Sequence, residues 1–181
     1  SDRQAKADGQ DDEPVSRPER LYRRLPEPMN TEVPADFAFA ADVVAIGGSA
    51  GGVDALLALL DGLQPPLRAT IVIVLHLPED QESRLVDVFA ARLPVPVEEA
   101  RPHGPVEPGC VYFAPPGYHL LVEADRTFSL SCDPPVLFSR PAIDVLFESC
   151  AEALGERMAA LLLTGANEDG AAGLARIQAA G

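Results

Sequence analysis

The stretch that most constrains the fold is VVAIGGSAGGVDALLALL, residues 43–60, in which four glycines surround one serine. The uncharged residues before the glycines predict a buried strand, and the leucines after them recur at helical spacing. The glycines therefore mark a turn from strand to helix, which is where open α/β proteins place their sites. Such a turn either binds a phosphate on backbone N–H groups or displays a side chain for chemistry.

Composition and charge narrow the classes of function. Of the 181 residues, 47% are hydrophobic, which is enough for one globular domain with a sizeable core. The net charge of −14 repels a phosphate backbone and an anionic membrane surface, so we do not expect a nucleic-acid partner. The sequence contains neither a signal peptide nor an apolar run near twenty residues. We therefore expect a cytoplasmic protein without direct membrane insertion.

The cysteines do not indicate a disulfide framework or a metal site. There are three, Cys110, Cys132 and Cys150, with no CxxC pair and no histidine at a ligand spacing. We expect reduced and mostly packed thiols, and no metal.

The chain divides by composition into a tail and a domain. Residues 1–40 hold nine acidic residues, six basic residues and five prolines, which predicts a disordered linker or tail, whereas 41–181 form the domain. Strands are expected at 42–47, 70–76, 95–99, 110–114 and 159–164, helices near 51–61, 80–92, 142–154 and 170–180, and an antiparallel hairpin within 119–132. This order predicts an α/β fold: a doubly wound, mainly parallel sheet with helices on both faces and an added β-hairpin.

The glycine turn fits a displayed nucleophile better than a nucleotide site. Dinucleotide binding needs GxGxxG, but Ser49 stands at the central glycine, and no acidic residue closes a second strand to hold a ribose. Gly47, Ser49 and Gly51 instead match the GxSxG spacing of a nucleophile elbow. His76 follows the next strand, so parallel pairing would place it beside Ser49, where a base must lie to accept the serine proton.

A third strand-to-helix turn supplies an acid. Asp169 follows an apolar strand and precedes a helix, so it should reach the same sheet edge and orient His76, although it could instead only cap its helix. Asp144 is an alternative acid, but its place at the start of a helix suits a cap better. The order Ser, His, Asp differs from that of the α/β-hydrolases, which argues against an ordinary lipase or esterase.

Residues 43–181 resemble the catalytic domain of the CheB-type protein-glutamate methylesterases of bacterial chemotaxis. The matching segments are IGGSAGG, VLHLP, VEPGCVYFAPPGYHL, SRPAIDVLF and LLTGANEDGAAGL, in family order. The resemblance implies a serine esterase that hydrolyses γ-glutamyl methyl esters on the cytoplasmic helices of chemoreceptors and also deamidates receptor glutamines. It places the catalytic triad on Ser49, His76 and Asp169.

Further residues follow from the mechanism and from the resemblance. The oxyanion needs backbone N–H donors, which are expected from Ala50 at the start of the helix and from Ala166 in the TGA turn. Arg140, in SRPAIDVLF, is expected to steer an acidic receptor helix; the alternatives are a plain surface charge and a local pair with Asp144. His103 and His119 are expected to be structural or solvated. No cofactor is required.

The sequence departs from the family in three places. Ala166, Asn167 and Glu168 stand where the family motif TGMGxDGA has methionine, glycine and a commonly neutral residue. Residues 1–40 are too few for a receiver domain, so regulation would come from a separate receiver or regulatory protein. The family continues with further strands beyond Gly181, so we expect either truncation there or an exposed sheet edge that something else covers. The alternatives are a catalytically altered CheB-like binding or scaffolding module and a serine hydrolase with another substrate.

Overall fold

The computed structural model describes residues 41–76, 84–164 and 168–181. The tail expected over 1–40 lies outside these residues, as do the first turn of the helix expected near 80–92 and the oxyanion candidate Ala166. No helix in the described ranges is long and apolar enough to cross a bilayer.

The described chain alternates strands and helices nearly as the hydrophobic pattern predicts. The elements are β1 (Val43–Gly48), α1 (Gly52–Leu60), β2 (Thr70–Leu75), α2 (Leu85–Ala90), β3 (Val97–Glu99), β4 (Val111–Phe113), β5 (His119–Val122), β6 (Phe128–Ser131), α3 (Ile143–Leu154), a 3₁₀ turn (Gly155–Arg157), β7 (Met158–Leu162) and α4 (Ala171–Ala180). Most boundaries fall within two residues of those predicted. The described part of the second helix is shorter than expected, because α2 ends before the TT turn at 91–92.

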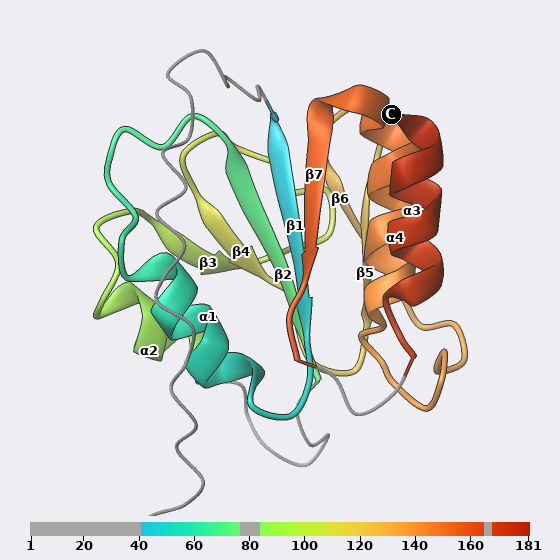
Figure 1. The fold of residues 1–181 in the computed structure, drawn as a ribbon, viewed down its shortest axis with the longest axis horizontal. Helices are drawn as coiled ribbons and strands as arrows, with labels where there is room; N and C mark the ends of the chain where they lie inside the picture. Colours follow the sequence, from blue (N-terminus) through green and yellow to red (C-terminus); the bar gives the residue numbers. More distant parts are fainter. Residues whose placement is uncertain (1–40, 77–83, 165–167) are drawn as a thin grey trace, which may run out of the picture. The chain divides into compact units, whose positions relative to one another are not determined.

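Five strands form a parallel sheet in the order β3-β4-β2-β1-β7, and β5 pairs antiparallel with β6 in a separate hairpin (Figure 1). In Figure 1, α1 and α2 lie on one side of the sheet and α3 and α4 on the other. The predicted doubly wound sheet with an added hairpin is therefore confirmed. Within the described residues, β7 pairs with β1 alone and forms one edge of the sheet.

The two faces of the sheet hold two separate cores, because successive strand side chains point to opposite faces. On one face, Ile46 and Ile73 pack with Leu56 of α1 and Phe89 of α2, and the Phe89 ring lies 5.1 Å from that of Phe113. On the other face, buried residues of the sheet pack with α3 and the β5–β6 hairpin; these include Val72, Val74, Leu120, Phe128, Leu146 and Phe147. Burial on both faces explains why the central strands read as continuous apolar runs.

Two of the glycines at the end of β1 and in the turn after it are required by geometry. A Cβ on Gly47 would lie 2.3 Å from Ile143 Cγ2, so only glycine lets the start of α3 approach β1 this closely. Gly51 has φ +76°, the left-handed region that favours glycine, immediately before α1. Close packing of α3 and a sharp entry into α1 together explain why a strand ends in this glycine-rich turn.

Candidate active site at the carboxyl edge of the sheet

Ser49 and His76 lie side by side at the carboxyl ends of neighbouring strands. Gly48, the last residue of β1, pairs with Leu75, the last residue of β2, so the next residue of each strand reaches the same edge. The His76 backbone N–H donates to the Gly48 carbonyl oxygen at 3.0 Å, which extends the ladder to this point. Ser49 is half-buried. In Figure 1 this edge is at the lower ends of the strands.

Asp169 reaches this edge from the loop between β7 and α4. Its Oδ2 atom lies 2.8 Å from His76 Nε2, and the exposed fractions of the histidine and aspartate side chains are 13% and 0%. The two residues are 93 positions apart in the sequence, so only the parallel arrangement of β2 and β7 around β1 brings them together. The structure therefore pairs the predicted base with the predicted acid.

Three hydrogen bonds hold the Asp169 carboxylate in its ionised form. Besides His76, the backbone N–H groups of Ile143 and Asp144 donate to Oδ2 and Oδ1, each at 2.8 Å. Burial raises the pKa of Asp169, but these hydrogen bonds outweigh it and leave the pKa below its usual value of 3.8. A buried, negatively charged acid is thus fixed against the imidazole ring.

Asp144 is buried too, and its side chain caps a different helix from the one in which it lies. Its Oδ1 atom accepts the backbone N–H groups of Gly170 at 2.9 Å and Gly173 at 2.7 Å, at the start of α4. Asp144 is therefore a cap, as its position suggested, but of α4 rather than of α3. Asp169 in turn caps α3, and the same carboxylate contacts His76; its role as triad acid stays a prediction.

The second ring nitrogen of His76 is available as a base. Because Nε2 faces the Asp169 carboxylate, the hydrogen of the neutral ring belongs on Nε2, and Nδ1 is the proton acceptor. Nδ1 lies 3.5 Å from the Ser139 hydroxyl oxygen, at the long limit of a hydrogen bond. No hydrogen bond between the Ser49 hydroxyl and His76 is present in the described ranges; catalytic hydrogen bonds often tighten only when substrate binds.

The start of α1 places backbone N–H groups beside Ser49. α1 begins at Gly52, so the Ala50 amide lies just ahead of its positive dipole end. The Ser49 N–H donates to the Thr164 carbonyl oxygen at 2.8 Å, and the Thr164 hydroxyl donates to the Ala50 carbonyl oxygen at 2.7 Å. These bonds tie the turn after β1 to the end of β7 and orient the Ala50 peptide. The second expected donor, Ala166, lies outside the described residues.

Arg140 does not form the expected pair with Asp144. Its Nη1 atom donates to the carbonyl oxygens of Cys132 and Asp133, both at 3.1 Å, while its buried Nε has no partner among the residues described. The guanidinium group thus braces the loop that follows β6. Whether it also steers a receptor helix remains a prediction.

The other histidines are placed as expected. His119 is 1% exposed; its Nδ1 accepts the Ala142 N–H and its Nε2 donates to the Pro134 carbonyl oxygen, both at 3.1 Å. His103 is exposed. Ser139 was missed by sequence reasoning: it opens the SRPAIDVLF segment, but nothing in that segment indicated that its hydroxyl would lie near His76.

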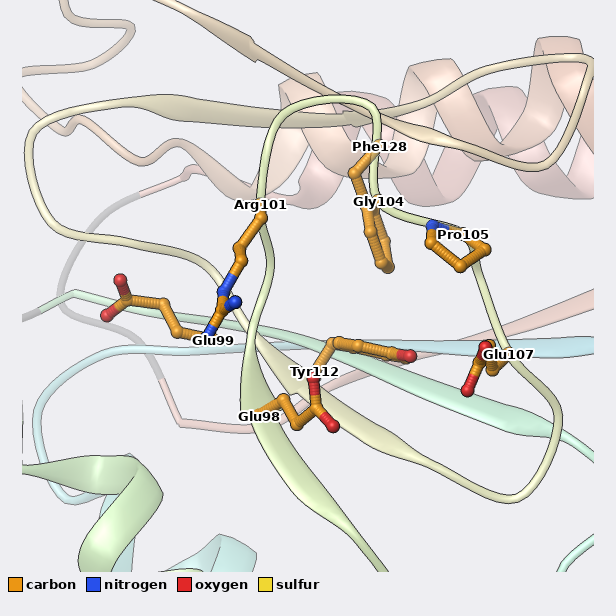
Figure 2. A pocket seen from close by; sticks show the side chains of 8 residues that line it. All are labelled: Glu98, Glu99, Arg101, Gly104, Pro105, Glu107, Tyr112 and Phe128. Carbon is orange, nitrogen blue, oxygen red and sulfur yellow. The ribbon is translucent and has the colours of Figure 1, made fainter.

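Elsewhere on the described surface, the chain forms a cavity of about 270 Å³ (Figure 2). It is lined by Glu98, Glu99, Arg101, Gly104, Pro105, Glu107, Tyr112 and Phe128. Figure 2 shows Phe128 and Pro105 on one side of it and Tyr112 on the other, so it lies by β3, β4 and β6 and contains none of the three predicted catalytic residues. No group of acidic, histidine and cysteine side chains in the described ranges could hold a metal ion.

The family model CheB methylesterase matches residues 44–181. The crystal structure of the Thermotoga maritima CheB methylesterase catalytic domain superposes with a TM-score of 0.74 at 30% identity, over 77% of this chain and 76% of that one. The fold described above is therefore one that has been solved experimentally.

Curated relatives from several bacteria are similar over the same region. A Leptospira interrogans protein is 40% identical over 137 residues, which cover 76% of this chain and 71% of that protein. The protein-glutamate methylesterase/protein-glutamine glutaminase 1 of Hahella chejuensis is 45% identical over 148 residues, or 80% of this chain and 41% of that protein. The chain thus spans only about two fifths of the length of the Hahella relative.

Proposed function

Because the chain belongs to the CheB methylesterase family, a family of chemotaxis enzymes, we propose that it hydrolyses γ-glutamyl methyl esters with Ser49 as nucleophile, His76 as base and Asp169 as orienting acid. The observation that carries this proposal is the 2.8 Å contact between His76 Nε2 and the buried Asp169 carboxylate, beside the half-buried serine of the glycine turn.

Acylation begins when the Ser49 hydroxyl oxygen attacks the ester carbonyl carbon. His76 Nδ1 accepts the hydroxyl proton, and the negative charge of the tetrahedral intermediate falls on the former carbonyl oxygen. The Ala50 N–H, ahead of the α1 dipole, supports that charge, and the Ala166 N–H is the second donor that we propose. The intermediate collapses by breaking the bond to the methoxy group, which leaves as methanol with the proton from His76.

Deacylation repeats these steps with water. His76 Nδ1 removes a proton from a water molecule as its oxygen attacks the acyl-enzyme carbonyl, and the proton then returns to Ser49 as the glutamate carboxylate leaves. The same steps with a glutamine side chain would release ammonia, which is the glutaminase activity named for the Hahella relative. No metal or cofactor enters either cycle.

Asp169 makes the histidine cycle possible in two ways. It fixes the hydrogen on Nε2, so that Nδ1 is always the accepting nitrogen, and its negative charge stabilises the imidazolium that forms during each proton transfer. The depressed pKa of Asp169 keeps that charge present at neutral pH. The carboxylate need not be protonated at any step.

The substrates that we propose are methylated chemoreceptors, on whose cytoplasmic helices the glutamyl esters lie. The methyl group of an ester carries no charge, whereas the product carboxylate would be repelled by a chain of net charge −14, which favours product release.

Methanol release from a methylated receptor cytoplasmic fragment tests the function. We expect release by the wild-type chain, loss of release in Ser49→Ala, and labelling of Ser49 by a fluorophosphonate in the wild type only. An unlabelled Ser49 together with release no greater than that of Ser49→Ala would favour a binding or scaffolding module. Labelling of Ser49 without methanol release would indicate a serine hydrolase of different substrate.

A further inference from the structure

A tight turn at Val136–Ser139 lies next to the candidate active site. The Val136 N–H donates to the Ser139 carbonyl oxygen at 3.1 Å, and the Ser139 N–H donates to the Val136 carbonyl oxygen at 2.9 Å. The two central residues, Leu137 and Phe138, have φ of +47° and +66°. Two positive φ values in succession are typical of a type I′ turn, which normally carries asparagine and glycine, so two bulky residues here are strained.

The second bulky residue contributes almost nothing to the folded core. Phe138 is 99% exposed, whereas the other large exposed hydrophobic side chains in the described ranges are only 40–45% exposed. An aromatic side chain that is both strained and solvated lowers stability without burying area. Strain of this kind clusters at functional sites, and a function at the protein surface would account for it.

The turn is held firmly against the catalytic edge. Ser139, the residue after Phe138, places its hydroxyl oxygen 3.5 Å from His76 Nδ1. On either side, Arg140 is hydrogen-bonded to the carbonyl oxygens of Cys132 and Asp133, and the Pro134 carbonyl oxygen accepts from buried His119. Phe138 is therefore displayed on a braced loop, one residue from a group that touches the proposed base.

We propose that Phe138 is a specificity residue that inserts between apolar side chains of the substrate protein, on the receptor helix one turn from the esterified glutamate. This inference rests on the proposed function and names how its protein substrate is recognised. Aromatic side chains, Phe among them, are enriched at the cores of protein–protein interfaces, where a few residues carry most of the binding energy. An apolar contact also adds affinity that does not depend on charge, which is useful to an enzyme whose net charge of −14 repels acidic partners.

The charge argues against two other occupants. Two copies of this chain would each carry a net charge of −14, and an anionic membrane surface would repel the chain as well. A methylated stretch of a receptor helix is repelled less, because a methyl ester, unlike a glutamate carboxylate, carries no charge.

Binding is measured first, because it does not depend on turnover. In a Ser49→Ala background, calorimetry with a fully methylated receptor cytoplasmic fragment should show a Kd about tenfold higher for Phe138→Ala, as expected for loss of an aromatic anchor. Phe138→Trp should restore binding to within about threefold. Leu59→Ala, which removes a 45% exposed side chain from α1, is the matched control and should bind like the Ser49→Ala parent.

Turnover then separates recognition from a defect in the triad. In the wild-type background, Phe138→Ala should raise KM for the methylated fragment about tenfold. The resulting fall in kcat/KM should be at least five times larger than any fall in kcat/KM for p-nitrophenyl acetate. Phe138→Gly relieves the positive φ, so it should unfold at the same or a higher temperature while losing the same affinity. A structural role for Phe138 could not produce this combination.

Three results would overturn the inference. One is an unchanged Kd for Phe138→Ala, which would leave the side chain without a role in substrate binding. Another is an equal loss on both substrates, which would mean that Phe138 acts on the triad. The third is a wild-type dimer that Phe138→Ala converts to monomer in sedimentation, which would assign the side chain to self-association. If Ser49 is not a nucleophile but Phe138→Ala still weakens binding, the proposed function fails and this inference stands.

Discussion

Asp144 and Asp169 cap each other's helices: Asp169 accepts the N–H groups of Ile143 and Asp144 at the start of α3, and Asp144 accepts those of Gly170 and Gly173 at the start of α4. The proposed triad acid is thus held by the same bonds that join the two helices on one face of the sheet. Its orientation toward His76 depends on α3 and α4 being docked, so packing and catalysis are coupled at this point.

The two carboxylates should respond differently to the same substitution. Asp169→Asn should slow methanol release by roughly 10⁴-fold, because an amide no longer stabilises the imidazolium and can hold His76 in the wrong tautomer. Asp144→Asn should leave kcat close to that of the wild type and lower the free energy of unfolding by about 1–2 kcal/mol, through loss of charge-assisted bonds to α4. Steady-state kinetics and urea unfolding of both variants check this; the reverse result would make Asp144 the triad acid.

Stability should fall in acid through Asp169. Its pKa is depressed in the folded chain, so its ionised form adds stability above the unfolded value near 3.8, and this stability is lost as the pH falls from there through the lower folded pKa. Urea unfolding should therefore show a larger gap between wild type and Asp169→Asn at pH 6 than at pH 3. Asp61→Asn, at an exposed carboxylate, sets the baseline. A gap that does not change with pH would contradict the depressed pKa.

Gly47 should not tolerate a side chain while Ile143 is present. Gly47→Ala should lower the free energy of unfolding by about 1–3 kcal/mol, because its Cβ would lie 2.3 Å from Ile143 Cγ2 and force α3 away from β1. Since α3 carries the N–H groups that orient Asp169, kcat should fall as well. The double variant Gly47→Ala/Ile143→Ala should be more stable than the sum of the single changes by about 0.5–3 kcal/mol. Strict additivity would show that the contact is not the cause.

The three thiols should differ widely in reactivity. Cys132 is exposed, whereas Cys110 and Cys150 are buried; burial raises the pKa of Cys110, and it raises that of Cys150 to about 12. Ellman's reagent at pH 8 should modify one thiol rapidly in the folded chain and three in urea. Cys132→Ser should remove the rapid phase. A rapid reaction that persists in Cys132→Ser would mean that one of the buried thiols opens readily to solvent.

Much of the candidate site was predictable, because it depends on local patterns and on one global rule. Apolar runs followed by Ser49, His76 and Asp169 predict three strand ends, and a parallel sheet brings strand ends to a common edge. Neither step needs the packing of particular side chains. That is why the pairing of His76 with Asp169 could be predicted across 93 residues of sequence.

The partners of Asp144 and Arg140 and the exposure of Phe138 could not be predicted in the same way. A short acidic side chain at a helix start suggests a cap, but only the docking of α3 against β1 and α4 decides which helix receives it. The letters VLFS contain no glycine or asparagine, so nothing in them predicts a type I′ turn.

The sequence by itself determined the order of strands and helices, the glycine turn after β1 and the edge at which the polar residues gather, since these follow from hydrophobic periodicity and backbone freedom. Only the tertiary structure decided that Asp144 caps α4 and Asp169 caps α3, and that Phe138 stands in solvent beside that edge. The physical reason is that hydrophobic periodicity depends on residues near one another in the sequence. Hydrogen-bond partners and exposure depend instead on segments that are distant in the sequence and come within a few ångströms of each other in the fold.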